Sequence, residues 1–144
     1  MKIDFYILEA SQQKSLHFAC GLIEKAYLAQ QKLYIHTASR EDAERLDTLL
    51  WAYRDDSFVP HQLYQAHTDN PAPVQIGFEQ PPTDSNTQLI NVSQNLPPDY
   101  AAFSHLIEIV FSDPVVQQLA RERYKHYREQ EHDITTYKLK ANEI

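Results

Sequence analysis

The sequence predicts a single α/β domain, residues 1–144, in which a mostly parallel, Rossmann-like sheet is flanked by helices. Short apolar runs rich in β-forming residues alternate with longer segments whose apolar residues recur at helical spacing. This strand–helix–strand–helix order favours a parallel sheet with right-handed crossovers. With 144 residues, of which 42% are apolar, the chain has enough material for one domain with a hydrophobic core.

Two strand–helix pairs are expected in the first third of the chain. Residues 3–8 form an apolar run typical of a buried strand, and residues 16–27 then carry apolar side chains at helical spacing. Residues 32–36 have the pattern of a second strand. Ser39, with an acidic residue three positions later, indicates the capped start of a second helix, which we expect to end at Trp51.

The middle of the chain is expected to contain long loops, because seven of the eight prolines lie between Pro60 and Pro98. Two short strands are predicted there, at 74–78 and 89–92. The gap of about ten residues is short for a helical crossover, so either the strands pair antiparallel or they lie apart in the sheet. A helix is expected to begin at Tyr100, because four apolar residues follow at helical spacing: Phe103, Leu106, Ile107 and Val110.

A final helix is predicted after Asp113, a favourable N-cap residue, and Pro114, a favourable first helical residue. One side of this helix should face the core, through Val115, Val116, Leu119 and Ala120. Arg123 also projects toward the apolar side, so we expect it to pair with a carboxylate inside the fold. Beyond Glu129 the sequence alternates only weakly and ends in a polar tail.

The opposite side of this final helix carries Arg121, Tyr124, Lys125 and Arg128, which follow the i, i+3, i+4, i+7 spacing. Three positive charges therefore surround one aromatic ring. The whole chain has a net charge of −7, so this side is a local anion-attracting surface on a protein that otherwise repels anions. A charged helix side is often only a solvated surface, and spacing alone does not identify a partner.

Several kinds of chemistry are not expected from this sequence. The two glycines are not in a phosphate-binding context, so no nucleotide-binding loop and no cofactor are expected. The seven histidines include no H-x-x-x-H pair and the one cysteine cannot build a thiolate zinc site, so no metal is expected. Cys20 lies in a helical apolar stripe and is interpreted as a core residue. No catalytic constellation is recognised, and the protein is expected not to be an enzyme.

The predicted location is the cytoplasm. No apolar run approaches the roughly 18–20 residues that a membrane span needs. The N-terminal residues include an acidic residue where a signal peptide has only basic and apolar ones, and a single cysteine suits a reducing compartment.

Two motifs resemble a known family. The run LARERYKxYR at 119–128 resembles the C-terminal helix of the chi subunit of bacterial DNA polymerase III. A second match consists of RLDxxLW at 45–51 followed by SFVPHxL at 57–63. The order and separation of these blocks also fit, and the chain is identified as a member of the chi family over essentially its full length.

This resemblance implies a non-catalytic accessory subunit of the polymerase III holoenzyme, acting in the clamp-loader complex during DNA replication. Chi pairs with a small subunit, psi, and binds the acidic C-terminal tail of single-stranded DNA-binding protein (SSB). Family members also engage a repair helicase in place of psi, and contact with DNA is only indirect. Matched by motif, the tail-binding pocket falls to Trp51, Phe58 and Tyr124, and the charges fall to Arg121, Lys125 and Arg128. The psi-binding surface and the oligomeric state stay open.

Two alternatives of other classes are considered. One is a small Rossmann-like, nucleotide-dependent enzyme, which a thermal shift with nucleotides would distinguish. The other is direct binding of single-stranded DNA through Trp51, Tyr124 and the basic helix, because stacking combined with positive charge is how such sites work. The net negative charge of the chain argues against this second alternative.

Overall fold

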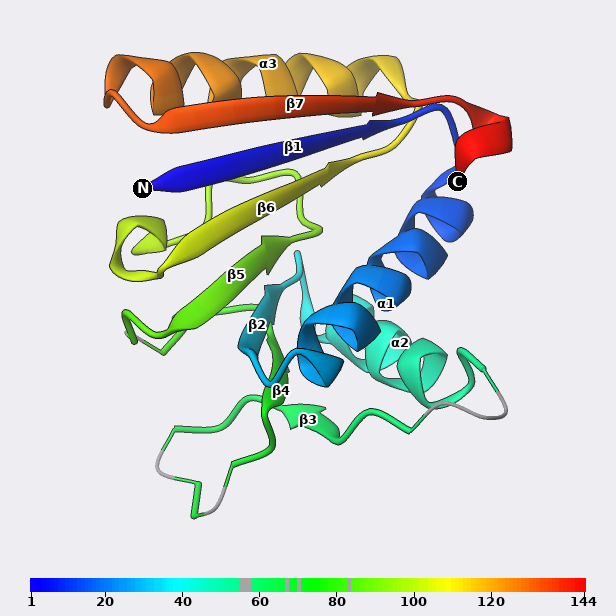
Figure 1. Cartoon of the computed structure of the whole chain (residues 1–144), viewed down its shortest axis with the longest axis vertical. Coiled ribbons are helices and arrows are strands. Elements are labelled where there is room, and N and C mark those ends of the chain that lie inside the picture. Colours follow the sequence, from blue (N-terminus) through cyan, green and yellow to red (C-terminus); the bar gives the residue numbers. More distant parts are fainter. Residues whose placement is uncertain (55–57, 67, 70, 83) are drawn as a thin grey trace.

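The structure is a computed structural model that describes residues 1–54, 58–66, 68–69, 71–82 and 84–144. Within these residues, seven strands form one sheet in the order β3-β4-β2-β5-β6-β1-β7, and every neighbouring pair is parallel (Figure 1). The predicted single α/β domain is therefore confirmed, and its sheet is wholly parallel.

The strands of the described chain are β1 (Lys2–Leu8), β2 (Lys32–His36), β3 (His61–Leu63), β4 (Val74–Gly77), β5 (Thr87–Asn91), β6 (His105–Val110) and β7 (Asp133–Leu139). Its helices are α1 (Gln12–Leu28), α2 (Arg40–Trp51) and α3 (Pro114–Glu129), with short 3₁₀ turns η1 (Tyr100–Ala102) and η2 (Ala141–Glu143). The side chains of Ser11, Ser39 and Asp113 each accept a hydrogen bond from the first turn of the helix that follows.

The helices cover both faces of the sheet (Figure 1). On one face, α1 and α2 pack over a core that includes Ile23, Leu46 and Ile76, and α2 contacts β3 and β4. On the other face, α3 contacts β6 and β7 over a second core that includes Phe5 and Tyr127. The two helices that carry the family motifs, α2 and α3, therefore lie on opposite faces and near opposite edges of the sheet.

The first strands and helices agree with the sequence. The strand predicted at 32–36 matches β2, the helix capped by Ser39 ends at Trp51, and Cys20 is completely buried. The strands predicted at 74–78 and 89–92 correspond to β4 and β5, and β2 lies between them. Of the two arrangements left open, the strands therefore lie apart in the sheet and do not pair antiparallel.

The helix predicted from Tyr100 is wrong. Tyr100 begins only the short turn η1, and residues 105–110 form β6, which pairs with β5 and β1. β6 is covered on both faces, so most of its residues are apolar, and a short stretch that is mostly apolar can also satisfy helical spacing. Three of its residues are Ile or Val, whose branched side chains suit a strand.

Candidate partner-binding site

Helix α3 is fixed to the sheet by a buried polar network. Arg123 is 5% exposed and donates to both carboxylate oxygens of Glu108 on β6, from Nε at 3.1 Å and from Nη2 at 3.2 Å. Its Nη1 donates to the Gln94 carbonyl oxygen at 2.7 Å. The Tyr127 hydroxyl donates to Glu108 at 2.6 Å, and the Asn91 amide donates to it at 2.9 Å. The predicted pairing of Arg123 with an internal carboxylate is confirmed.

Opposing effects act on the ionisation of Glu108. Complete burial raises the pKa of this carboxyl, while the positive charge of Arg123 and the hydrogen bonds from Tyr127, Arg123 and Asn91 act to lower it. Burial also raises the pKa of the Tyr127 hydroxyl, so this group stays protonated and donates. The network therefore sets the rotation of α3 about its axis, because Arg123 and Tyr127 must point into the sheet.

This rotation determines which α3 residues face the solvent. Val116 and Ala120 pack into the core, as predicted, whereas Val115 is 67% exposed and was wrongly assigned to the core-facing side. On the outer side, three basic residues are exposed and the tyrosine between them is half-buried: Arg121, Lys125, Arg128 and Tyr124. The predicted row of cations around one ring is therefore present.

A cleft of about 330 Å³ opens beside these residues, between α3 and the strands β1, β6 and β7. Its lining consists of Phe5, Ile7, Val110, Gln117, Ala120, Arg121, Tyr124, Thr136 and Lys138. The floor is apolar, because the ring of Tyr124 lies against that of Phe5 with 5.5 Å between centroids, and Ile7 and Val110 complete it. The cleft lining contains two cations, Arg121 and Lys138, and no carboxylate.

The cleft can therefore accept an apolar group and hold a negative charge at its rim. The guanidinium of Arg121 is exposed and donates a hydrogen bond to the neutral side-chain amide of Gln118, at 3.4 Å. A guanidinium in this state is available to pair with a carboxylate from a partner in two-point geometry.

Trp51 and Phe58 form a second exposed group elsewhere on the molecule. They are 48% and 67% exposed, and their ring centroids lie 5.4 Å apart. The indole also lies 4.0 Å from the ring of His61, the first residue of β3. Both ring nitrogens of His61 lie within hydrogen-bond distance of backbone carbonyl oxygens, Val59 at 2.6 Å and Asp47 at 3.0 Å. His61 therefore holds the start of β3 against α2.

The six residues predicted to line one site are therefore separated into two groups. Trp51 and Phe58 lie beside β3 at one edge of the sheet, whereas Arg121, Tyr124, Lys125 and Arg128 lie on α3 beside β7 at the other edge (Figure 1). Six strand spacings of about 4.8 Å separate the two edges by roughly 29 Å along the sheet. The expectation of one shared pocket was wrong because sequence spacing does not reveal which face of the sheet each helix covers. Ser57, the first residue of the second motif, lies outside the described residues.

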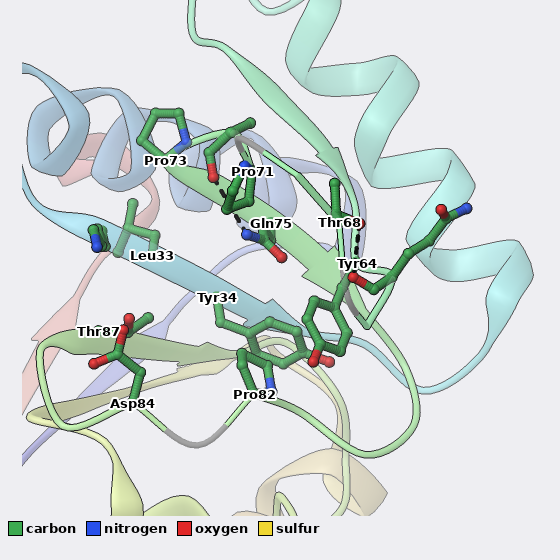
Figure 2. A pocket seen from close by; sticks show the side chains of 13 residues that line it. Leu33, Tyr34, Tyr64, Thr68, Pro71, Pro73, Gln75, Pro82, Asp84 and Thr87 are labelled. Atoms are coloured by element: carbon green, nitrogen blue, oxygen red, sulfur yellow. Dashed lines mark hydrogen bonds between the residues drawn. The ribbon is translucent and has the colours of Figure 1, made fainter.

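A larger cavity, of about 600 Å³, lies at the amino-terminal ends of β2, β4 and β5 (Figure 2). Figure 2 shows the rings of Tyr34 and Tyr64 side by side at its base, with Pro82 beneath Tyr34. The charged side chains of its lining are one cation and one anion, Lys32 and Asp84. This balance gives the cavity no preference for an anion, so it does not match the cationic character of the α3 cleft.

The sequence had pointed to the α3 side of the cleft but not to its other walls. Thr136 and Lys138 come from β7, where the alternation of polar and apolar residues is weak. Phe5 comes from β1, whose apolar run correctly predicted burial, and its ring lies beneath the cleft. The polar composition of residues 133–139 could have predicted an edge strand here, because a strand at the edge of a sheet is more polar than an inner one.

Among the described residues there is no group of three or more His, Cys, Asp or Glu side chains that could hold a metal ion. No helix in the described part of the chain is long and apolar enough to cross a membrane.

The fold and the site define a class of protein: a small parallel α/β domain that presents an open cationic cleft. The family model of the DNA polymerase III chi subunit, HolC, matches residues 1–135. The chain belongs to this family, and the resemblance inferred from the two motifs is confirmed.

Curated relatives support the same assignment. The chain is 34% identical to the DNA polymerase III subunit chi of Pseudomonas aeruginosa over 139 residues, which cover 96% of both chains. It is 31% identical to the subunit chi of Haemophilus influenzae, covering 92% of this chain and 93% of that one. With the Escherichia coli subunit chi the identity is 33% over 110 residues, covering 76% and 75%. All three relatives carry the same name, DNA polymerase III subunit chi.

Among solved structures, the crystal structure of T4 UvsW resembles this chain with a TM-score of 0.66. The match covers 96% of this chain and 41% of that one, at 7% sequence identity. At this identity the similarity concerns the fold alone.

Proposed function

We propose that this chain is an accessory subunit of the clamp-loader complex in the polymerase III holoenzyme, and that the α3 cleft binds the acidic C-terminal tail of SSB during DNA replication. The observation that carries the proposal is one cleft that combines an apolar floor with two cations and has no carboxylate among its described lining residues, on a chain whose net charge is −7. An acidic peptide that ends in a hydrophobic residue with a free carboxylate is complementary to both features.

Each part of the tail has a matching partner in the proposed complex. The terminal side chain enters the cleft over Phe5 and Tyr124, and its carboxylate pairs with Arg121. The upstream aspartates approach Lys125 and Arg128, which are exposed on the same side of α3. Because these outer contacts are solvated, their contribution should decrease as the salt concentration rises.

We propose that the surface formed by Trp51 and Phe58 binds the second partner, psi. Two adjacent exposed aromatic rings are the kind of group that anchors protein–protein interfaces. A repair helicase would occupy this surface in place of psi. The protein would thus work in the cytoplasm, reaching DNA only through its protein partners.

The tail-binding proposal is tested by fluorescence anisotropy with a labelled peptide of the SSB C-terminus. Arg121→Ala should raise the Kd by a factor of about 30, which corresponds to the roughly 2 kcal/mol typical of an interface anchor. Arg45→Ala is the matched control, because Arg45 is an exposed arginine on α2 whose carboxylate partner is Asp42, at 3.5 Å. An Arg121→Ala variant that binds the peptide as tightly as the Arg45→Ala control would refute the proposed site.

Trp51→Ala separates the two surfaces. It should leave tail affinity within about twofold of the wild type, since Trp51 lies at the other edge of the sheet, while it weakens a pull-down of psi. If Trp51→Ala weakens tail binding as strongly as Arg121→Ala does, the division into two surfaces is wrong. Circular dichroism of both variants checks that the fold is retained.

A further inference from the structure

Strand β7 has a free edge whose unpaired backbone groups can be identified. The N–H of Asp133 donates to the carbonyl of Met1 at 3.0 Å, and the carbonyl of Leu139 accepts from Glu9 N at 2.9 Å. The backbone groups of the odd-numbered residues of β7 therefore face β1 and its continuation. Because the backbone groups of successive strand residues point to alternate sides, those of Ile134, Thr136 and Lys138 point away from the sheet. No strand of the described chain lies beyond β7.

The same three residues also face α3 with their side chains. Ile134 packs against the core cluster beneath α3, and Thr136 and Lys138 line the cleft. On the other face, Tyr137 stacks on Tyr6 with 5.0 Å between ring centroids. The free edge of β7 and the cleft are therefore continuous, so a chain lying along the edge can place side chains in the cleft.

The cations of α3 are aligned with this edge. α3 and β7 run in opposite directions, joined by the turn after Glu129 (Figure 1). From Arg121 to Arg128 the helix rises about 10 Å, which equals about three residues of an extended strand. Arg121 lines the cleft together with Thr136 and Lys138, so Arg128 lies level with the beginning of β7.

We propose that the acidic C-terminal tail of SSB binds as an eighth strand, parallel to β7, and that its backbone pairs with the free groups of Ile134, Thr136 and Lys138. This inference rests on the proposed function of the α3 cleft. The direction follows from the charges: a terminal carboxylate at Arg121 places the upstream residues toward Lys125 and Arg128, so the tail runs from the beginning of β7 to its end. Edge strands commonly recruit extended peptides in this way.

If the tail binds as an added strand, its successive side chains point alternately toward α3 and away from it. If the terminal side chain points into the cleft, the residues two and four positions before it point to the same side and face the α3 cations. The intervening residues point to the opposite face, away from α3. Acidic residues at the second and fourth positions before the end should therefore contribute more to affinity than those at the first and third.

Two measurements with the full chain test the binding mode. Hydrogen exchange followed by NMR should show the amides of Ile134, Thr136 and Lys138 slowed at least tenfold by a saturating SSB tail peptide, whereas Tyr137, already facing β1, changes little. In a series of tail peptides with single N-methylated amides, methylation at alternate positions should weaken binding at least tenfold, while methylation at the intervening positions has little effect.

The outcomes separate this inference from the proposed function. If the peptide binds in an Arg121-dependent manner but the edge amides exchange as fast as before and N-methylation has no alternation, strand addition is overturned and the cleft assignment stands. If the wild-type chain does not bind the peptide, both are overturned. Slower exchange of the three edge amides, together with weaker binding on N-methylation at alternate positions only, supports the eighth strand. The control is the Arg121→Ala variant at the same peptide concentration, in which the edge amides should not be protected.

Discussion

Replacing Arg123 with methionine removes the positive partner of Glu108 while keeping a side chain of similar length. The carboxylate of Glu108 would then be left in a site where it is 0% exposed. Removing one partner of a buried ion pair costs about 3–5 kcal/mol, because the remaining charge is desolvated without compensation. Two hydrogen bonds to Glu108 and one to the Gln94 carbonyl are lost together with the charge. We therefore expect Arg123→Met to lower the free energy of unfolding by about 3–5 kcal/mol at pH 7.

The loss of stability caused by Arg123→Met should increase from acid to neutral pH. Burial already raises the pKa of Glu108, and removing Arg123 removes the largest influence that lowers it. A carboxyl whose pKa is raised in the folded state contributes stability that is present at low pH and lost as pH rises through the folded pKa. The destabilisation by Arg123→Met should therefore be largest at neutral pH and should shrink as Glu108 becomes protonated in acid.

The assay is urea unfolding at a series of pH values from 5 to 8, followed by circular dichroism. Arg121→Met is the matched control on the same helix, and as an exposed substitution it should change stability by less than about 0.5 kcal/mol. The double variant Glu108→Gln/Arg123→Met should recover most of the loss at pH 7, because no unpaired charge remains. A loss below about 1 kcal/mol, or one that does not vary with pH, would refute this account of the network.

Three further predictions concern single positions. Gly77→Ala should destabilise the domain by about 1–3 kcal/mol in urea unfolding, because its β carbon would overlap the hydroxyl of the buried Tyr34. The same change at Gly21, where the nearest contact is 3.1 Å, is the control, and an equal loss at both sites would contradict the reasoning. Burial raises the pKa of Cys20 to about 12, so its thiol should react with a disulfide reagent at pH 8 only after unfolding, and rapid reaction of the native protein would disprove this. Asp113→Ala should lower the free energy of unfolding by about 0.5–2 kcal/mol through loss of the N-cap, whereas Asp113→Asn should retain most of it.

The starts of helices α2 and α3 were predicted correctly, because they depend on residues that are close together in the sequence. The N-cap residues Ser39 and Asp113 and the proline after Asp113 located the starts of α2 and α3, because the hydrogen bonds that stabilise a helix start lie within one turn. Arg123 was correctly expected to find an internal carboxylate, since a charge on an apolar helix side needs a partner. The identity of that partner, Glu108, depended on which strand lies under α3.

The wrong prediction of a helix at residues 100–110 also arose from contacts between residues that are far apart in the sequence. Glu108 interrupts the apolar run and leaves Phe103, Leu106, Ile107 and Val110 in a helical pattern. In the structure Glu108 is as buried as its neighbours, because Arg123, Tyr127 and Asn91 satisfy its carboxylate. Glu108 therefore breaks the apolar pattern of a strand in which residues 106–110 are all buried.

Four of the six predicted site residues, the three cations and the ring on α3, could be grouped correctly from the sequence because they share one helix. The separation of Trp51 and Phe58 from Arg121 could not, since it depends on the order of strands in the sheet and on the face that each helix covers. The family motifs did place Trp51 and Phe58 together, and their rings lie 5.4 Å apart.

The position of the two surfaces at opposite edges of one sheet has a thermodynamic consequence. Electrostatic influence decays over about 8 Å at physiological ionic strength, far less than the width of the sheet, so charge brought to one edge does not alter the potential at the other. A parallel sheet held by two cores also behaves as a stiff spacer. Two proteins bound at these edges would neither compete nor cooperate, and the concentration of the ternary complex should follow from the two separate dissociation constants alone.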